Sequence, residues 1–266
     1  MNQKYQLLEF IAEGSYGKIY KGQNKFTKEF VAIKIEPKQY QLKLLINESK
    51  VYYLLKKSVG IPSLKWFGSD EENFYLITEL LGISVNDLSK HTSLLTGEMI
   101  INVAKQMLSC IISIHEMKLI HRDIKPENFL FGLYENNNKI YLIDYGFCKS
   151  YQKDENHIPL IYHKKIIGTP NYISLNIHSL QTSSRRDDIE SWIYILMDLL
   201  NLNTWKKYDY EKQPELFVKT KRDCILENIP SFIKELLIYT RALSFEESPN
   251  YSYLSETLDK YIYKHI

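Results

Sequence analysis

The sequence predicts an α+β fold of two unequal lobes: a small antiparallel sheet with one helix, followed by a larger and mainly helical lobe. Short β-rich runs separated by turns fill the first 80 residues, and a helical spacing of apolar residues dominates the remainder. The length of 266 residues suits one large domain or two lobes that share a boundary. We expect a single domain over residues 1–266, with the lobe boundary at about residue 80.

The predicted sheet fills the first lobe. Five runs that are bounded by turns predict its strands: Leu7–Ile11, Lys18–Lys21, Phe30–Ile35, Leu64–Gly68 and Phe74–Leu80. One helix is predicted over residues 42–56, because apolar residues there recur at roughly helical spacing. The sequence Gly60-Ile61-Pro62 then stops that helix.

Two helices are predicted in the second lobe. Apolar residues between Met99 and Ile114 recur with the period of a long amphipathic helix. Residues Ile189–Leu200 predict another helix, which is apolar on nearly all sides. This second helix is too short to cross a bilayer, so we expect it in the buried core.

Composition and charge exclude several classes of protein. The chain has 34 Lys and Arg against 32 Asp and Glu, and the net charge of +2 is too balanced for a protein that coats nucleic acid. Cys110, Cys148 and Cys224 lack the spacing of a disulfide framework or a zinc site. No signal peptide or membrane span is apparent. We expect an intracellular protein, in the cytoplasm or nucleus or both, that binds neither nucleic acid nor membrane.

The octet HRDIKPEN at residues 121–128 carries the strongest chemical signal. It lies in a loop between the long helix and a strand predicted at Phe129–Phe131. Such a loop can present an acid that accepts a hydroxyl proton (Asp123), a cation for a transferring phosphate (Lys125) and an amide for a metal ion (Asn128). The alternative is a polar loop whose Asp and Asn cap turns, and it does not explain six matching motif positions.

A second acidic motif follows the predicted strand Ile140–Ile143, which a tight turn at residues 135–139 separates from the strand before it. Asp144-Tyr145-Gly146 places a carboxylate at the strand end, where it suits a Mg²⁺ ion that bridges phosphates. Alone, this tripeptide is equally typical of an Asx turn. Its order and spacing after the octet favour metal binding.

The first lobe supplies two further candidates. Gly14-Ser15-Tyr16-Gly17 joins two predicted strands, and its glycines would let the backbone approach a triphosphate, although a plain hairpin has the same pattern. Lys34 lies in an otherwise apolar strand, where an unpaired ammonium is costly. Glu48 on the next helix is its expected partner; in the alternative, both side chains are separately solvated.

Together these residues resemble the motifs of eukaryotic protein kinases, and further segments are similar to the casein kinase 1 family. GTPNYISLN at residues 168–176 resembles that family's replacement for the usual APE motif, and SRRDDIES at residues 184–191 resembles its SRRDDxES signature. Other segments fall where the family has similar ones: Gly60–Pro62, Glu79–Gly82, His157–Pro159 and Pro249–Leu254. The resemblance runs from about residue 5 to the C-terminus and implies the bilobal protein kinase fold.

The resemblance implies phosphoryl transfer from ATP to Ser or Thr hydroxyls. Lys34 would hold the α- and β-phosphates and pair with Glu48, Asp123 would orient or deprotonate the hydroxyl, and Lys125 would steady the γ-phosphate. Asp188 would brace the backbone of the octet. The Mg²⁺ ligands would be Asn128 and Asp144. The other ATP contacts would be Ile11, Gly14, Ser15, Gly17, Ile19, Ala32, Thr78, Glu79, Leu81, Leu130 and Ile143.

The resemblance also implies a class of substrate, because the family prefers Ser or Thr near acidic or phosphorylated residues. Arg122, Lys149 and Lys164 match one of its anion pockets, where charge-assisted hydrogen bonds would hold a phosphate. A second family pocket uses an Arg where this chain has Asn171, so a requirement for priming phosphorylation is not predicted. Ala12 replaces the first glycine of the usual phosphate-binding loop, and we expect weaker nucleotide affinity from it.

Three other interpretations are weaker. The intact catalytic set disfavours a pseudokinase scaffold, and Lys125 with the SRRDDIES segment disfavours a small-molecule phosphotransferase. The poxvirus-related sister group of casein kinase 1 has a differently composed catalytic loop. We expect a constitutively active monomer without a regulatory tail, and we interpret the basic run Lys219-Thr220-Lys221-Arg222 as a solvated surface.

Overall fold

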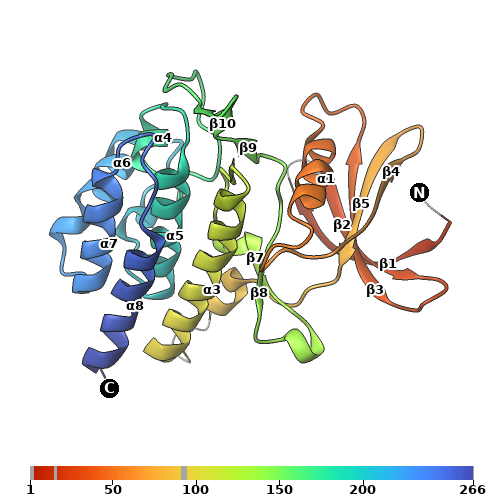
Figure 1. The fold of residues 1–266 in the computed structure, drawn as a ribbon, viewed down its shortest axis with the longest axis horizontal. Coiled ribbons are helices and arrows are strands. Elements are labelled where there is room, and N and C mark those ends of the chain that lie inside the picture. The colour runs from red at the N-terminus through yellow and green to blue at the C-terminus, as the bar shows by residue number, and fades with distance from the viewer. Residues whose placement is uncertain (1–2, 15–16, 91–94, 266) are drawn as a thin grey trace.

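The computed structural model describes residues 3–14, 17–90 and 95–265. Its N-terminal lobe contains a five-stranded antiparallel sheet in the order β1-β2-β3-β5-β4. The strands are β1 (Tyr5–Gly14), β2 (Gly17–Asn24), β3 (Phe30–Pro37), β4 (Leu64–Ser69) and β5 (Asn73–Glu79). Helix α1 (Leu44–Leu54) packs against β4 and β5. Figure 1 shows this lobe at one end of the molecule.

The C-terminal lobe is mainly helical and forms the other end of the molecule (Figure 1). Its α-helices are α2 (Val85–Ser89), α3 (Gly97–Glu116), α4 (Leu175–His178), α5 (Arg185–Leu199), α6 (Pro214–Asp223), α7 (Ser231–Ala242) and α8 (Tyr251–His265). Short strands pair as β6 (Leu119–Ile120) with β9 (Lys149–Ser150), β7 (Phe129–Phe131) with β8 (Ile140–Leu142), and β10 (Gln152–Lys153) with β11 (Asn156–His157). The predicted bilobal α+β fold is confirmed.

Helix α5 forms the core of the C-terminal lobe, where it packs against α3 and α7. From Asp187 to Leu199 every residue except Asp198 is buried, which confirms the predicted core helix. Trp192 donates a hydrogen bond from Nε1 to the backbone oxygen of Ala104 on α3 at 3.0 Å. The helix begins earlier than predicted, because Asp187 accepts a hydrogen bond from the backbone nitrogen of Ser184 at 2.7 Å and so satisfies the first turn.

Helix α3 meets the length and composition of a membrane-crossing helix, with a mean hydropathy of 1.2 in its most apolar window. A core helix can pass the same test, and the expectation that the protein binds no membrane stays a prediction. In the folded chain 56% of that window is buried inside the protein, and α3 packs against α5 and α8. An apolar helix whose buried side contacts other helices has the pattern of a core helix.

Two details differ from the sequence-based predictions. The connection between β7 and β8 is longer than a tight turn and contains a 3₁₀ helix, Tyr134–Asn136. On α6, Lys219 and Arg222 are exposed as predicted, but Lys221 is fully buried, so its assignment to a solvated surface is wrong. Lys221 lies one helical turn after the buried Phe217, and residues at this spacing share one face of a helix.

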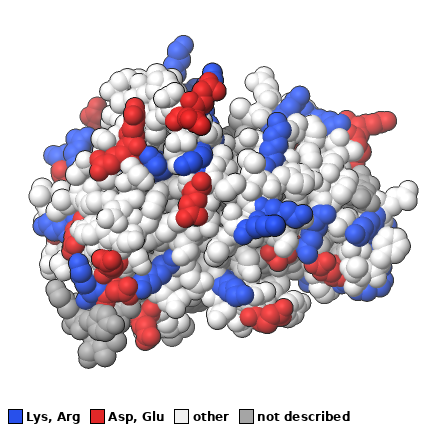
Figure 2. Space-filling model, in the orientation of Figure 1, with Lys and Arg blue, Asp and Glu red and all other residues white. Residues whose placement is uncertain are grey.

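Charges of both signs are mixed on one face of the protein. On the face that Figure 2 shows, Lys and Arg side chains alternate with Asp and Glu side chains over both lobes.

Candidate active site

Three charged side chains from both lobes meet in one group. Lys34 on β3 donates hydrogen bonds from Nζ to Glu48 Oε2 on α1 and to Asp144 Oδ1 after β8, each at 2.8 Å. The Glu48 side chain is 3% exposed, whereas that of Asp144 is 35% exposed. The predicted pairing of Lys34 with Glu48 is confirmed, and the alternative of two separately solvated side chains is excluded.

Burial and the charges of this ion triad together shift the pKa of each of its three members. Burial opposes the charge on Lys34, yet the two carboxylates outweigh it and raise the Lys34 pKa above its ordinary value. Burial raises the pKa of Glu48 to about 7, since Lys34 offsets only part of the effect. At Asp144 burial is overcome by the attraction of Lys34, which lowers the pKa to about 2. Asp144 is therefore an anion at neutral pH, and Glu48 titrates near neutrality.

Two polar side chains fix α1 beside the triad. Asn47 Nδ2 donates to the backbone oxygens of Gly146 and Cys148 at 2.9 and 3.0 Å. Glu36 Oε2 on β3 accepts a hydrogen bond from the backbone nitrogen of Leu45 at 3.0 Å, in the first turn of the helix. Neither Asn47 nor Glu36 is predicted from the sequence, because an amide and an acid at these positions match no motif.

The octet forms a loop around Asp123. The Lys125 ammonium donates to Asp123 Oδ2 at 2.7 Å, and Thr169 Oγ1 donates to Asp123 Oδ1 at 2.9 Å. Asn128 Nδ2 donates to the backbone oxygen of Asp123 at 2.9 Å. The loop thus brings the predicted catalytic residues Asp123, Lys125 and Asn128 together, and both oxygens of the Asp123 carboxylate are held in place.

Asp188 on α5 fixes the backbone of this loop. Its carboxylate accepts hydrogen bonds from the backbone nitrogens of His121 at 2.7 Å and Arg122 at 3.0 Å, and it lies 3.1 Å from His115 Nε2. Arg122 has a φ of 71°, a left-handed conformation that is uncommon outside glycine. The bracing role predicted for Asp188 is therefore confirmed by its contacts.

Asp144 is joined to the loop through its neighbour Ile143. The backbone nitrogen of Ile143 donates to the oxygen of Asn128 at 2.9 Å, and the oxygen of Ile143 lies 3.1 Å from His121 Nε2. Asp144 itself has a φ of 65°, which turns the chain sharply after β8. The fold therefore places Asp144 between the octet and Lys34.

A comparison with known families agrees with this arrangement. The chain matches the family model described as "Protein kinase domain" over residues 5–253. The chain belongs to the protein kinase family. Protein kinases transfer phosphate from ATP to protein substrates and use a divalent metal ion, so this general activity follows from the family.

Several predicted ATP contacts of the kinase share one face of the N-terminal sheet. Ile19 pairs with Lys34 across β2 and β3, and Ala32 pairs with Thr78 across β3 and β5. Directly paired residues, and residues two apart on one strand, point to the same side of a sheet. Ile11 is placed differently, because it lies in a β-bulge of β1 and is 50% exposed.

Strands β1 and β2 remain paired up to Gly14 and Gly17, the two glycines predicted to cover phosphates. A Cβ atom on Gly17 would lie 2.2 Å from the backbone oxygen of Ile35, so only glycine allows β2 to approach β3 there. The predicted contact Ser15 lies outside the described residues.

The other predicted ATP contacts of the kinase lie near the junction of the lobes. Glu79 ends β5, and its Oε1 accepts a hydrogen bond from the backbone nitrogen of Ser63 at 2.7 Å. Leu81 follows β5, and Leu130 on β7 forms a β-bridge with Ser84. The chain that connects the lobes therefore runs beside β7.

A small cavity of the kinase is lined by the basic side chains Arg122, Lys149, His163 and Lys165. The anion pocket expected from the sequence contains Lys164 in place of Lys165. The residues of this segment that line the cavity are His163, Lys165, Ile166 and Ile167, and Lys164 is not among them. Arg122 and Lys149 of the expected pocket therefore line this cavity together with Lys165, and the role of Lys164 stays a prediction.

The donor set of the kinase fits a divalent ion that also binds phosphate. Asp144 Oδ1 accepts a hydrogen bond from Lys34, which leaves Oδ2 for a cation. Asn128 donates through Nδ2, which leaves its amide oxygen as a second ligand. Among the described residues no group of three His, Cys, Asp or Glu side chains could hold a metal by itself. An ion held by Asn128 and Asp144 would therefore need more oxygen ligands, such as those of a nucleotide.

Proposed function

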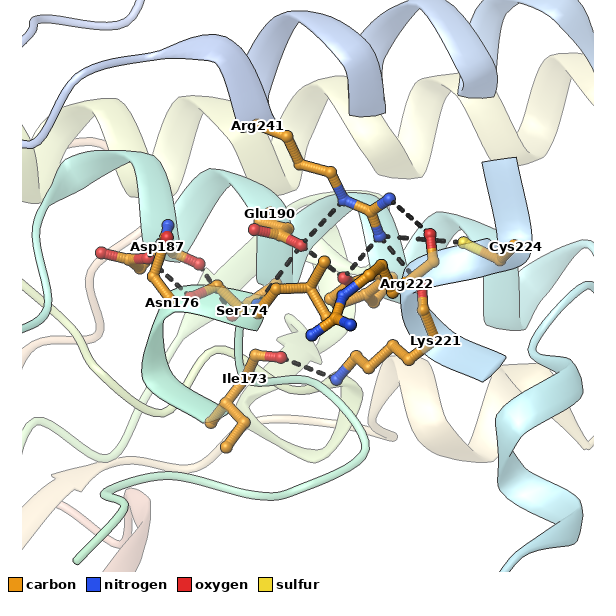
Figure 3. A network of polar contacts seen from close by, with 12 residues as sticks. Ile173, Ser174, Asn176, Asp187, Glu190, Lys221, Arg222, Cys224 and Arg241 are labelled. Carbon is orange, nitrogen blue, oxygen red and sulfur yellow. Dashed lines mark hydrogen bonds and ion pairs between the residues drawn. The ribbon is translucent and has the colours of Figure 1, made fainter. Parts of the chain in front are cut away.

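We propose that this kinase is a serine/threonine kinase of the casein kinase 1 type, which transfers the γ-phosphate of ATP to hydroxyls near acidic or phosphorylated residues. The supporting observation is a link between the two segments that resemble this family. Asp187 of SRRDDIES accepts hydrogen bonds from Ser174 Oγ at 2.6 Å and from Asn176 Nδ2 at 3.1 Å (Figure 3). Both donors belong to the segment that resembles the family's replacement for the APE motif. The two segments that resemble the family are therefore in direct contact.

The contacts of Asp123 support a role toward the acceptor hydroxyl. Lys125 and Thr169 hold the two carboxylate oxygens in one orientation. A Ser or Thr hydroxyl that donates to Asp123 would be aligned for attack, and its proton would pass to the carboxylate. Lys125 would remain close enough to stabilise the charge of the transferred phosphoryl group.

The triad supports a role toward the nucleotide. Lys34 would hold the α- and β-phosphates, and Glu48 would keep the ammonium on that side of the sheet. Asn128 and Asp144 would hold Mg²⁺, which when bound neutralises phosphate charge. Positioning and charge compensation would then supply most of the rate.

The basic cavity supports the proposed substrate class. Arg122, Lys149 and Lys165 offer charge-assisted hydrogen bonds to a carboxylate or phosphate of the substrate. Arg122 uses Nε to donate to the backbone oxygen of Phe147 at 2.6 Å, which orients its remaining N–H groups. An intracellular location is proposed as well, and the free, buried Cys110, Cys148 and Cys224 agree with a reducing compartment.

Transfer of radiolabelled phosphate from ATP to matched peptides tests this proposal. The peptides share one acceptor Ser and differ at one upstream position, which is Ala, Asp or phosphoserine. We expect the acidic and phosphorylated peptides to be labelled faster. Lys165→Glu should lower this preference about tenfold, the size of one lost charge-assisted hydrogen bond.

Lys164→Glu is the matched control, because it makes the same change one residue outside the cavity lining. Equal losses in both variants would contradict the cavity as the recognition site. Equal labelling of all three peptides would contradict the acidic preference, and wild-type protein that labels none of them would contradict the serine/threonine assignment.

A further inference from the structure

A lysine outside the catalytic motifs reaches the chain next to Asp123. Lys221 on α6 is 0% exposed. Its Nζ atom donates hydrogen bonds to the backbone oxygens of Pro170 and Asn171 at 3.0 Å each and of Ile173 at 2.6 Å. Figure 3 shows the side chain extending from α6 toward Ile173. One buried cation thus binds three backbone groups within four consecutive residues.

The three acceptors suit an ammonium at Lys221. A neutral amine has two N–H donors, whereas an ammonium has three. Three oxygens within 3.0 Å of Nζ therefore match the donors of the charged form. Burial lowers the pKa of Lys221, and Arg241 acts in the same direction while Glu190 opposes it. The three backbone oxygens compensate this charge in the protein interior.

Aromatic rings complete the surroundings of this ammonium. Nζ lies 4.3 Å from the ring centroid of Tyr194, 5.5 Å from that of Trp205 and 5.8 Å from that of Phe217. Trp205 Nε1 also donates to the backbone oxygen of Asn171 at 3.2 Å. The charge is therefore enclosed by rings on one side and by the held backbone on the other.

The α6 backbone at Lys221 is itself fixed. Arg241 on α7 donates to the backbone oxygens of Lys221 and Arg222 at 3.0 Å each and pairs with Glu190 on α5 at 3.2 Å (Figure 3). This connection ties α5, α6 and α7 together. The backbone from which the Lys221 side chain extends is therefore held in place.

The segment that Lys221 holds faces the reaction site. Thr169, immediately before Pro170, donates to Asp123 at 2.9 Å. Gly168 has a φ of 102°, and a Cβ atom on it would lie 2.7 Å from the backbone oxygen of Arg122, so the segment passes tightly over the octet.

The same segment also borders a groove. Pro170 and Asn171 line this groove, of about 530 Å³, together with Tyr208 and Tyr210. Backbone that Lys221 fixes is therefore both a neighbour of Asp123 and part of a surface beside it.

We propose that Lys221 is a positioning residue for protein substrates, whose ammonium holds residues 170–173 in the conformation that receives the acceptor peptide. This inference rests on the proposed phosphorylation of proteins. The partners of Lys221 belong to the C-terminal lobe and not to the Lys34 triad. Its loss should therefore weaken peptide binding and leave ATP binding unchanged.

Two variants separate positioning from simple packing. Lys221→Met fills the same space with an apolar chain that suits the aromatic rings but donates no hydrogen bond. Lys221→Arg keeps the charge and several N–H donors but is larger. Positioning predicts that the peptide KM rises about tenfold in Lys221→Met and less in Lys221→Arg, with the ATP KM unchanged in both. Packing alone predicts the reverse order, and that order would overturn the proposal.

The matched control is Lys219→Met, the same substitution at an exposed lysine of the same helix. It should have the wild-type KM for peptide and ATP. An equal rise of both KM values in Lys221→Met would also refute the inference, because it would indicate general damage to the fold.

Hydrogen exchange supplies a readout that needs no substrate. The amides of Thr169 and of residues 171–174 should exchange faster in Lys221→Met than in the wild type and Lys219→Met, because the held backbone is released. Unchanged exchange of these amides would refute the inference. A protein that labels no peptide would contradict only the proposed function, and the exchange measurement would still test the role of Lys221. If Lys221→Met fails to fold, Lys221→Gln, which keeps two N–H donors, replaces it with a smaller expected change.

Discussion

Replacement of Lys34 by Met removes one ammonium from between two carboxylates. Glu48 is 3% exposed, and its pKa is already about 7 with Lys34 present, against an ordinary value of 4.5. Without Lys34 the buried carboxyl will bind a proton at neutral pH. Keeping it protonated at pH 7 costs about 1.36 × 2.5 ≈ 3.4 kcal/mol of unfolding free energy, and the wild type already bears most of this cost because its Glu48 pKa is about 7. Lys34→Met should therefore stay folded.

The deficit in unfolding free energy of Lys34→Met relative to the wild type should depend on pH in a defined direction. Because its pKa is about 7 in the wild type, Glu48 ionises above pH 7 there, whereas in the variant it must remain protonated. The folded variant then binds more protons than the folded wild type, so its relative stability falls as pH rises. We expect the deficit to be about 1 kcal/mol larger at pH 8 than at pH 7.

The loss of activity in Lys34→Met should be larger than the loss of stability suggests. One cation placed against the transferring phosphate lowers the activation barrier by about 3 kcal/mol. Without it, phosphate transfer should fall at least about 10²-fold. The measurements are radiolabel transfer to peptide and urea unfolding at pH 7 and pH 8. Lys65→Met is the control, because it removes only the surface pair with Glu29 at 2.7 Å.

Two results for Lys34→Met would refute this reasoning. Wild-type phosphate transfer would show that Lys34 does not act on the nucleotide. A deficit that stays constant or shrinks from pH 7 to pH 8 would show that Glu48 does not take up the proton.

Two further substitutions test other parts of the structure. Asp144→Asn removes a carboxylate charge with little change of shape, so phosphate transfer should fall at least about 10²-fold while thermal unfolding stays within a few degrees of the wild type; a wild-type rate would contradict the metal-binding role. Burial lowers the pKa of His178, which packs against Tyr210 and Phe217, to about 3 from 6.5. Because the unfolded state then binds more protons, stability should fall below pH 6.5, by about 2 kcal/mol at pH 5. His178→Phe should lack this loss in urea unfolding at pH 7 and pH 5, and an identical pH dependence in both proteins would count against it.

The pairing of Lys34 could be predicted from the sequence, because an ammonium in an apolar strand needs a partner wherever that strand lies. The core position of α5 could be predicted too, since a segment apolar on nearly all sides has nothing to present to water. Asn47 could not be predicted. Its amide has a role only because the fold places the backbone oxygens of Gly146 and Cys148 beside α1.

The basic residues show the same limit. Sequence proximity made Lys219, Lys221 and Arg222 look alike, yet helix geometry buries only the middle one of the three. Likewise Lys164 and Lys165 have equal charge and neighbouring positions, yet of the two it is Lys165 that lines the cavity in the folded chain.

By itself, the sequence determined which chemical groups this kinase has and in which loops and strands they lie, because local spacing and apolar period are properties of neighbouring residues. Only the tertiary structure decided how Lys221 is used. Its ammonium binds backbone oxygens about fifty residues earlier in the chain, and backbone oxygens are the same in every residue. A pattern of side chains in the sequence therefore cannot predict that contact.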